Sequence, residues 1–501
     1  MSEPRGSDGP RVEGGAAHHA ASGTRMVMLG QAGRLALQVL SVVILARLLS
    51  PTDYGLMALA LTVVALGEVF RDFGLSTAAI QAPHITRAQQ SNLLWINVGL
   101  GATLALIIVA SAPLLHHLER YSPVVGLLQV LSVTFIINGV LAQYRADLSR
   151  RLRFGALAVS DVVGAAVGVA SAIAAALAGA GVWALAVQQL AGVITTAALA
   201  ILFAGWLPRW PDRSADVRPM VRFGVGMVGT QLLGYGNNYV DTYTVALRFG
   251  PVPLGLYDRA FQLLMQPLNQ FLNPTTSVAV PLLSRLTPGG EEANRLLLRG
   301  QAALGYTLMA VAAFAAGAAP AIIALALGPR WSEAAPLFAV LACAGAVQAL
   351  GYVSYWAFIA RGLTTHLFRY SLFSIVVRVV CVVVGSFGGL IGVAIGFAVA
   401  PLIQLPLGIW VLSRHTPYPA RALLVGAGRA LTAAAVAAIT TGAVQHATAA
   451  FSPVVQLVAC GAAAVSAYGV VALVIPSVRR DLRGVAAFAR RVLTRDRVHV
   501  A

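Results

Sequence analysis

The chain has 501 residues, of which 58% are hydrophobic and 11% are charged, and its mean hydropathy is +0.79. This composition excludes an ordinary soluble domain and is typical of a polytopic membrane protein. The net charge of +17 comes from arginine alone, since the sequence contains no lysine, and the positive-inside rule accounts for it without a nucleic-acid partner.

Apolar runs of about 20 residues, the length that crosses a bilayer as a helix, recur along the whole chain. They predict an all-α polytopic membrane protein with about 14 transmembrane helices, in two pseudo-symmetric six-helix lobes followed by two C-terminal helices. The second and eighth runs are long and contain polar breaks. The predicted spans are residues 27–49, 55–80, 91–112, 123–143, 156–178, 182–204, 220–246, 254–284, 300–326, 335–360, 367–386, 389–412, 422–444 and 453–475.

The same pattern predicts how the chain is divided. Residues 205–219 form the longest polar segment inside the chain and therefore the expected boundary between the lobes. The predicted parts are a disordered cytoplasmic N-terminus (1–25), an N-terminal lobe (26–204), a cytoplasmic linker (205–219), a C-terminal lobe (220–412), two additional helices (413–476) and a basic cytoplasmic tail (477–501).

The arginines alternate between the two sides of the predicted membrane domain. With both termini in the cytoplasm, 26 arginines fall in cytoplasmic segments and three, Arg120, Arg248 and Arg330, fall in outer segments. Because cytoplasmic loops carry the excess of basic residues, this distribution fixes the orientation and supports an even number of spans. No signal peptide is evident, since the first apolar run is long and contains Arg34.

Two segments 200 residues apart resemble each other. ILARLLSPTDYGLMALA (44–60) and TVALRFGPVPLGLYDRA (244–260) share a Pro-x-x-x-Gly-Leu core, with Pro51 and Gly55 in the first and Pro251 and Gly255 in the second. Internal duplication in a membrane protein is typical of transporters whose halves rock against each other. These four residues are the candidate hinges, at the outer corner of each lobe.

A polar stripe runs along the first predicted helix. A charge inside a bilayer costs on the order of 2.5–3.5 kcal/mol at a helix centre, so each such residue needs a reason. Gln31, Arg34 and Gln38 lie three or four residues apart and therefore share one helical face. We expect this face to line a water-filled cavity. The alternative is that Arg34 pairs with a neighbour and locks the helix bundle.

The seventh predicted helix carries a matching stripe. It contains Gln231, Asn237, Asn238 and Asp241, together with Tyr235. Two duplicated helices that are each polar on one side are expected to face a shared central cavity. For Asp241 the alternatives are a structural ion pair and the binding of a coupling ion.

Other charged residues lie within or beside predicted spans. Glu68 is three residues from Arg71, which favours an internal ion pair over a coupling-ion site. Asp161 and Arg378 occupy corresponding helices of the two lobes, which suggests a role in opening the cavity, and Arg259 lies at the start of the eighth span.

No metal or cofactor site is expected. The adjacent His116 and His117 have no carboxylate or cysteine cluster beside them, and the three cysteines lie singly in apolar runs. The sequence contains no nucleotide-binding loop and no hydrolase motif, so an ATP-driven pump is unsupported within this chain.

Two blocks resemble a known family. ILARLLSPTDYGLMALALTVVALGEVFRDFGLSTAAIQ (44–81) resembles the opening block of Wzx-type polysaccharide exporters, and residues 241–286 resemble that family's Asp, Leu-Gly-x-Tyr corner and Pro-x-x-Ser-Arg ending. The similarity is greatest to the colanic-acid and teichuronic-acid exporter branch of the multidrug/oligosaccharidyl-lipid/polysaccharide flippase superfamily. It extends over roughly residues 25–415.

The resemblance implies a flippase without enzymatic activity that moves an undecaprenyl-diphosphate-linked oligosaccharide from the inner to the outer leaflet. Arginines in a cavity can offset the charge of a diphosphate, and amides can hydrogen-bond sugar hydroxyls. The implied contacts are Arg34 first, then Arg378 and Arg259, with Gln31, Gln38, Gln231, Asn237 and Asn238 at the sugar. Membrane lipids and other polysaccharide-assembly proteins are the expected partners, and a monomer is the default.

Three other functions are weighed against this one. A multidrug or metabolite antiporter of the same superfamily would share the fold, but it usually has an acidic or aromatic cavity. A lipid II flippase also shares the fold, and the opening block resembles it less. A membrane glycosyltransferase or polymerase of polysaccharide assembly would need a large outer loop, whereas the predicted outer connections are short.

Overall fold

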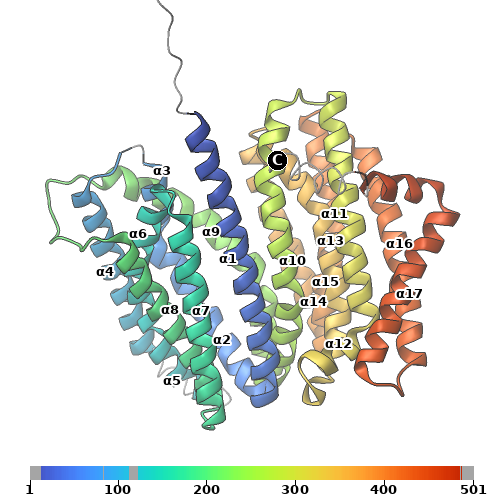
Figure 1. Cartoon of the computed structure of the whole chain (residues 1–501), viewed down its shortest axis with the longest axis horizontal. Coiled ribbons are helices and arrows are strands. Elements are labelled where there is room, and N and C mark those ends of the chain that lie inside the picture. The colour runs from blue at the N-terminus through green and yellow to red at the C-terminus, as the bar shows by residue number, and fades with distance from the viewer. Residues whose placement is uncertain (1–12, 83, 112–121, 486, 488–501) are drawn as a thin grey trace, which may run out of the picture. The chain divides into compact units, whose positions relative to one another are not determined.

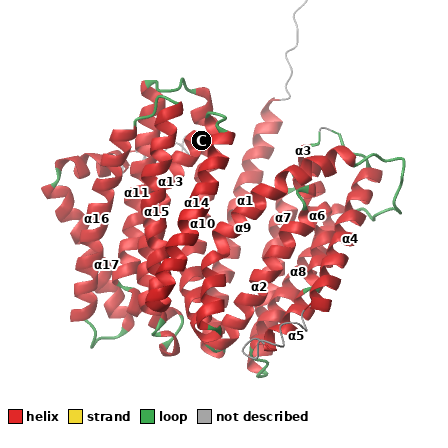
Figure 2. Cartoon of the chain, turned by 180° about the vertical axis from the view of Figure 1, so that it is seen from behind, coloured by secondary structure: helices red, strands yellow, loops and turns green. Residues whose placement is uncertain are grey.

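The computed structural model describes residues 13–82, 84–111, 122–485 and 487. Within this part of the chain every regular element is a helix, as Figures 1 and 2 show, which confirms the predicted all-α class. The elements are α1 Glu13–Leu48, α2 Pro51–Asp72, α3 Leu75–Gln81, α4 Arg87–Ser111, α5 Ser122–Leu131, α6 Val133–Arg150, α7 Phe154–Leu177, α8 Val182–Ala204, α9 Arg218–Phe249, α10 Pro251–Arg285, α11 Glu291–Gly317, α12 Ala319–Ala326, η3 Pro329–Trp331, α13 Ala334–Ala360, α14 Thr364–Gly385, η4 Ser386–Gly388, α15 Gly389–His415, α16 Ala420–Ala447 and α17 Pro453–Val474.

Eleven segments of the described residues are long and apolar enough to cross a membrane. One of them, Thr364–His415, contains both α14 and α15, which the short helix η4 separates. The long helices α9 and α10 are not among the eleven, because polar residues are distributed along both. The count of fourteen therefore stays a prediction.

The polar breaks expected in the second and eighth spans have different outcomes. Helix α2 ends at Asp72 and α3 starts at Leu75, with Phe73 and Gly74 between them at φ 45° and 67°. This left-handed turn is one that glycine adopts readily. By contrast, α10 runs without a break from Pro251 to Arg285, so the broken eighth helix was a wrong expectation.

The chain forms two compact units that are described separately. The first contains residues 1–45 and 63–231. Its helices approach closely at glycines: a Cβ atom on Gly101 of α4 would lie 2.5 Å from the Phe135 carbonyl oxygen, and one on Gly139 of α6 would lie 2.8 Å from that of Asn97. Helix α1 packs on α7 in the same way, since a Cβ on Gly30 would lie 2.7 Å from the Ala158 Cβ.

The second unit contains residues 46–62 and 232–501. Its core includes Trp331, which is fully buried and donates a hydrogen bond of 2.8 Å to the Ala46 carbonyl. The edge of the Tyr54 ring meets the same indole at 5.4 Å between ring centres. The start of α2 is thus fixed to a unit that otherwise consists of residues far along the chain.

The described part of the tail is docked on the second unit. Residues 476–485 are helical, and Val478 is fully buried. Asp481 accepts a hydrogen bond of 3.2 Å from the Tyr306 hydroxyl and forms an ion pair of 3.0 Å with Arg429. These contacts hold the first turns of the predicted basic tail against α11 and α16.

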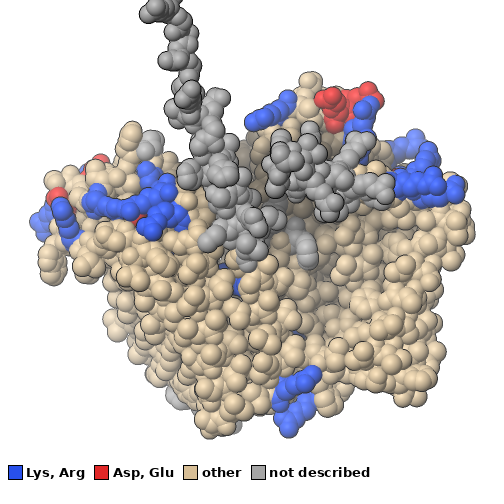
Figure 3. Space-filling view, in the orientation of Figure 1, with Lys and Arg blue, Asp and Glu red and all other residues tan. Residues whose placement is uncertain are grey.

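Charge is distributed as a membrane protein requires. On the face shown in Figure 3, basic side chains gather near the ends of the helices, and the surface between those ends is nearly free of charge. All of these basic residues are arginines. An uncharged band with charged margins fits a hydrocarbon layer between two headgroup regions.

Candidate functional site

The two duplicated corners contact each other inside the second unit. A Cβ atom on Gly55 would lie 1.8 Å from the carbonyl oxygen of Pro251, and a Cβ on Gly255 would lie 1.8 Å from that of Pro51. This reciprocal geometry brings the backbones of α2 and α10 together at a point where only glycine fits. The sequence predicted two equivalent corners, and the structure shows that they are one crossing.

The candidate Arg259 lies directly beside this crossing. Its guanidinium carbon is 4.2 Å from the centre of the Tyr54 ring, and its Nη2 atom is 2.6 Å from Asp258 Oδ2. Gln262 donates a hydrogen bond of 3.0 Å to the other oxygen of Asp258. Arg259 is therefore held by a carboxylate and an aromatic ring, and it is about nine-tenths buried.

A buried charged cluster lies deeper in the second unit. Asp241 of α9 is 1% exposed and accepts a hydrogen bond of 2.7 Å from the Tyr257 hydroxyl of α10. Arg378 of α14 is 5% exposed and interacts electrostatically with both residues. Asp241 and Arg378 were separate candidates in the sequence, and the fold brings them together.

Aromatic rings surround this cluster. The Arg378 guanidinium carbon lies 4.5 Å from the centre of the Phe397 ring of α15, and Phe261 meets Phe397 edge to face at 5.5 Å. Asp241 Oδ1 and Arg378 Nε have no hydrogen-bond partner among the described residues, and no salt bridge within 4.0 Å joins the two side chains there. A buried charge without a full set of partners is costly, and here the electrostatic attraction between Asp241 and Arg378 offsets part of that cost.

The polar residues of the α9 stripe differ in how exposed they are. Asn238 is exposed, whereas Gln231 and Asn237 are half-buried, and Asn237 Oδ1 has no partner among the described residues. The next turns of α9 carry a row of tyrosines: the Tyr235 and Tyr239 rings are 4.8 Å apart, and the Tyr235 and Tyr243 hydroxyls share a hydrogen bond of 2.8 Å. Only Tyr235 was noticed in the sequence, although a spacing of four residues already places all three on one face.

The polar stripe of α1 is more exposed than the buried cluster of Asp241 and Arg378. Arg34 and Gln31 are exposed, and Gln38 is half-buried. Gly30 and Gly33, on the neighbouring face, contact Ala158 and Val162 of α7. Among the described residues Arg34 has no ion pair and no hydrogen bond, so the expectation that it locks the bundle through a charged partner has no support there.

The carboxylates of the first unit do have partners. Arg71, which is buried, lies 2.6 Å from Glu68 Oε2, and Asn138 donates a hydrogen bond of 2.8 Å to the other oxygen of Glu68. Asp161 accepts two hydrogen bonds from the Arg145 guanidinium. The predicted internal pairing of Glu68 with Arg71 is thus present in the structure.

Comparison with known proteins supplies the family. The family model described as polysaccharide biosynthesis protein matches residues 44–336, which is more than half of the chain and includes both glycine corners. The chain belongs to this family of polysaccharide biosynthesis proteins. The match confirms the resemblance to polysaccharide exporters inferred from residues 44–81 and 241–286.

Individual relatives agree with the family. The lipopolysaccharide biosynthesis protein WzxC of Escherichia coli K12 is 22% identical over 386 residues, which cover 75% of this chain and 77% of WzxC. The teichuronic acid biosynthesis protein TuaB of Bacillus subtilis 168 is 21% identical over 392 residues, covering 75% and 79%. The structure of the lipid II flippase MurJ in an inward closed conformation aligns with a TM-score of 0.67 at 12% identity, covering 90% of this chain and 98% of that one, and it supports the fold alone.

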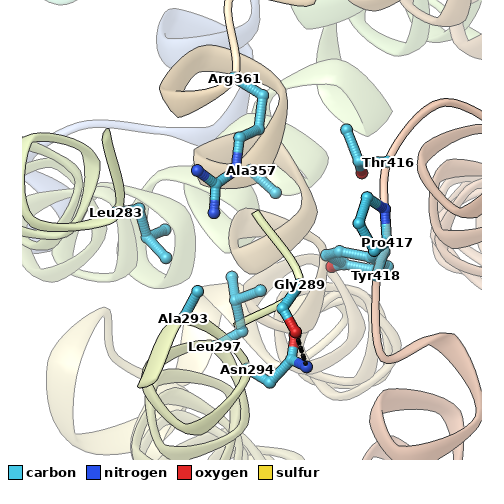
Figure 4. Close-up of a pocket in the computed structure, with 10 residues that line it drawn as sticks. All are labelled: Leu283, Gly289, Ala293, Asn294, Leu297, Ala357, Arg361, Thr416, Pro417 and Tyr418. Atoms are coloured by element: carbon cyan, nitrogen blue, oxygen red, sulfur yellow. Dashed lines mark hydrogen bonds between the residues drawn. The ribbon is translucent and has the colours of Figure 1, made fainter. Parts of the chain in front are cut away.

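One small pocket of this polysaccharide biosynthesis protein lies where the ends of α10, α11 and α13 meet the loop 416–419 (Figure 4). Arg361 donates a hydrogen bond of 2.7 Å to the Leu286 carbonyl, and Asn294 donates one of 3.1 Å to that of Gly289. Burial raises the pKa of Tyr418 to about 12. The pocket has room for about one water molecule and is too small for a sugar.

No group of three or more His, Cys, Asp or Glu side chains that could hold a metal occurs among the described residues. The candidate His116 and His117 lie outside that part of the chain.

Proposed function

We propose that this protein is a flippase that moves an undecaprenyl-diphosphate-linked oligosaccharide from the inner to the outer leaflet of the bacterial cytoplasmic membrane. Membership of the polysaccharide biosynthesis family carries the proposal, since the matched residues include both duplicated corners. The names of WzxC and TuaB, which refer to lipopolysaccharide and teichuronic acid, support a polysaccharide-related cargo.

The proposed mechanism is alternating access between two lobes, residues 26–204 and 220–412, with both termini in the cytoplasm. The crossing at Gly55 and Gly255 is the proposed hinge, because two helices in backbone contact can pivot with little side-chain rearrangement. The polar faces of α1 and α9 are proposed to line the cavity that opens to each side in turn. A monomer suffices for this cycle.

Arg34 is the proposed first contact of the cargo diphosphate. Arg259 and Arg378 each have a carboxylate nearby, Asp258 and Asp241, whereas Arg34 has none among the described residues. An arginine without an internal partner can give its charge to a phosphate at no loss elsewhere. Gln31, Gln38, Gln231, Asn237 and Asn238 are proposed to hydrogen-bond the sugars.

Coupling to an ion stays a proposal for Asp241 and Glu68. Each of these carboxylates already has a basic neighbour, Arg378 or Arg71. A cation that bound there would have to displace or compensate that arginine. Ion binding at either position should therefore be accompanied by movement of an arginine.

A multidrug antiporter of the same superfamily is the second candidate. The row formed by Tyr235, Tyr239 and Tyr243 favours it, because aromatic faces attract organic cations. The charge of Arg34, which has no ion pair within the described part of the chain, opposes it, since a cationic drug would be repelled. Efflux of a fluorescent organic cation from proteoliposomes that tracks the three tyrosines would support this second reading.

Deletion of the gene is expected to abolish surface polysaccharide and to trap lipid-linked oligosaccharide on the inner leaflet. The strain must lack redundant exporters, and the two quantities are measured by polysaccharide staining and by extraction of lipid-linked intermediates. Complementation with the intact gene serves as the control. Normal surface polysaccharide with no accumulation of intermediate would refute the flippase.

Replacement of Arg34 by alanine is expected to lower export about 10- to 100-fold, because a charge-assisted hydrogen bond is worth roughly 1.5–3 kcal/mol. Arg34→Lys should retain part of the activity, since lysine keeps the charge but loses the bidentate geometry. The amount of protein inserted in the membrane, measured by quantitative immunoblotting, should be unchanged. Arg330→Ala, at another exposed arginine, is the matched control, and equal export by R34A and R330A would remove Arg34 from the site.

A further inference from the structure

The polar segment 205–217, here called the strap, is a fixed structure on the first unit. Four side chains of α4 (Gln89, Ser91, Asn92 and Trp95) hold it through its backbone. Four of the hydrogen bonds are donated by the side chains: Gln89 Nε2 to the Asp216 carbonyl (3.0 Å), Asn92 Nδ2 to the carbonyls of Asp212 (2.6 Å) and Ala215 (3.2 Å), and Trp95 Nε1 to the Arg209 carbonyl (2.9 Å). Two more are donated by the strap: the Asp212 amide to Asn92 Oδ1 (2.8 Å) and the Arg209 amide to Ser91 Oγ (3.1 Å).

The strap places apolar side chains on opposite sides. Trp206 points inward, where it packs on Tyr144 at 4.8 Å and lies 5.0 Å from the Arg87 guanidinium. Leu207 and Trp210 point outward and are 77% and 85% exposed. The Trp210 ring stacks on Trp95 at 6.0 Å, with an angle of 9° between the planes. A backbone held by six hydrogen bonds thus presents two bare apolar side chains.

The arginines of the strap are available to an outside partner. Arg209 and Arg213 are exposed and have no ion pair among the described residues. The acidic side chains accept local hydrogen bonds instead. Asp212 accepts from the Ser214 hydroxyl and then from the Ser214 amide, and these bonds hold the pKa of Asp212 below its ordinary value, while Asp216 accepts from the Arg218 amide. The strap therefore presents two arginines that have no ion pair among the described residues, beside two hydrogen-bonded aspartates, together with exposed tryptophan and leucine.

The position of the strap indicates what its partner is. Trp95 lies eight residues after Arg87, or about 12 Å along α4, a helix long and apolar enough to span the membrane. With Arg87 in a headgroup layer about 5–8 Å thick, that depth lies in the upper acyl region, just below the headgroups. Lipid surrounds a membrane-spanning helix at this level, and the amphipathic ring of tryptophan is favoured close to the headgroups.

We propose that the strap is a membrane-interface anchor that binds anionic phospholipid headgroups of the cytoplasmic leaflet. Leu207 and Trp210 enter the upper acyl region, and Arg209 and Arg213 bind the phosphates. The proposal rests on the cytoplasmic placement of residues 205–219 and adds a lipid site to the proposed flippase. It makes this linker a fixed pivot on the membrane surface, where the sequence suggested only a polar connection.

The test uses the full-length protein in nanodiscs that contain phosphatidylcholine with increasing phosphatidylglycerol. Enrichment of phosphatidylglycerol around the protein is measured by mass spectrometry of co-purified lipid. The double variant Arg209→Gln/Arg213→Gln should lower this enrichment by about tenfold, since each arginine adds attraction to an anionic surface. The backbone contacts of Arg209 are kept in this variant, and Arg330→Gln is the control for charge alone.

A second measurement reports the depth of Trp210. The difference in fluorescence between the wild type and Trp210→Phe isolates one of the seven tryptophans. Phospholipid brominated near the headgroup should quench this difference signal strongly. An unquenched signal together with unchanged enrichment in R209Q/R213Q would overturn the lipid site and leave an acidic protein surface as the occupant. Neither readout depends on flipping, so the proposal can fail while the flippase stands.

Discussion

Replacing Gly255 with leucine will abolish export and destabilise the protein. A Cβ at this position would lie 1.8 Å from the Pro51 carbonyl oxygen, and that oxygen belongs to a backbone that cannot rotate away. Overpacking of this kind costs about 1–3 kcal/mol or more, and here it forces α2 and α10 apart at the proposed hinge. Gly55→Leu should have the same effect, because the contact with Pro251 is reciprocal.

The matched control is Gly351→Ala in α13, where a Cβ would meet no atom within 4 Å. This variant should unfold at the same temperature as the wild type or slightly above it, since alanine favours a helix by roughly 1 kcal/mol over glycine. Thermal unfolding of the purified protein and export in cells are measured for all three variants. If G55L and G255L both have the unfolding temperature and the export level of G351A, the close crossing of α2 and α10 does not exist in the membrane.

Replacing Arg378 with methionine will cost more stability than replacing both members of its charged pair. The single variant leaves the Asp241 carboxylate in a site that is 1% exposed, and removing one partner of a buried pair costs about 3–5 kcal/mol. The double variant Asp241→Leu/Arg378→Met removes both charges and should recover most of that loss. The single variants Arg378→Met and Asp241→Leu and the double variant form a double-mutant cycle, measured by thermal unfolding in one detergent.

The pair Arg145 and Asp161 is the matched control for this cycle. It is partly exposed, with side chains 39% and 21% accessible, so a coupling of about 0–1 kcal/mol is expected. A coupling between Asp241 and Arg378 no larger than this would mean that their charges do not stabilise each other. Export by the stable double variant then shows whether the pair also serves transport: retained export would remove both residues from the site.

Several features of the fold could be predicted from the sequence because they depend on local composition. Long apolar runs must form helices in lipid, since every backbone amide there needs an internal partner. The uninterrupted α10 was harder to predict, because its polar residues resemble a break on a hydropathy profile. In a packed helix those residues find partners, as Gln262 does with Asp258.

The sequence predicts which residues belong to the candidate site, but it does not predict which of them lie together in the fold. Asp241 and Arg378 stand out in the sequence because charges are rare in apolar runs, but nothing along the chain indicates that α9, α10 and α14 bring them together with Tyr257. The pairing of Glu68 with Arg71 was predictable, since the two are one helical turn apart. The strap was taken for a plain linker, because its hydrogen bonds to α4 join residues more than 100 positions apart.

The sequence by itself determined the class of the protein, the duplicated corners and the positions of the charged residues within the predicted membrane spans. Each of these follows from composition or spacing along one helix, where the physics is local. The tertiary structure alone decided that Gly55 and Gly255 form a single crossing, that Arg378 faces Asp241, and that Arg34 has no partner among the described residues. Those outcomes depend on which helices pack together, and packing is set by the whole set of side-chain shapes at each interface.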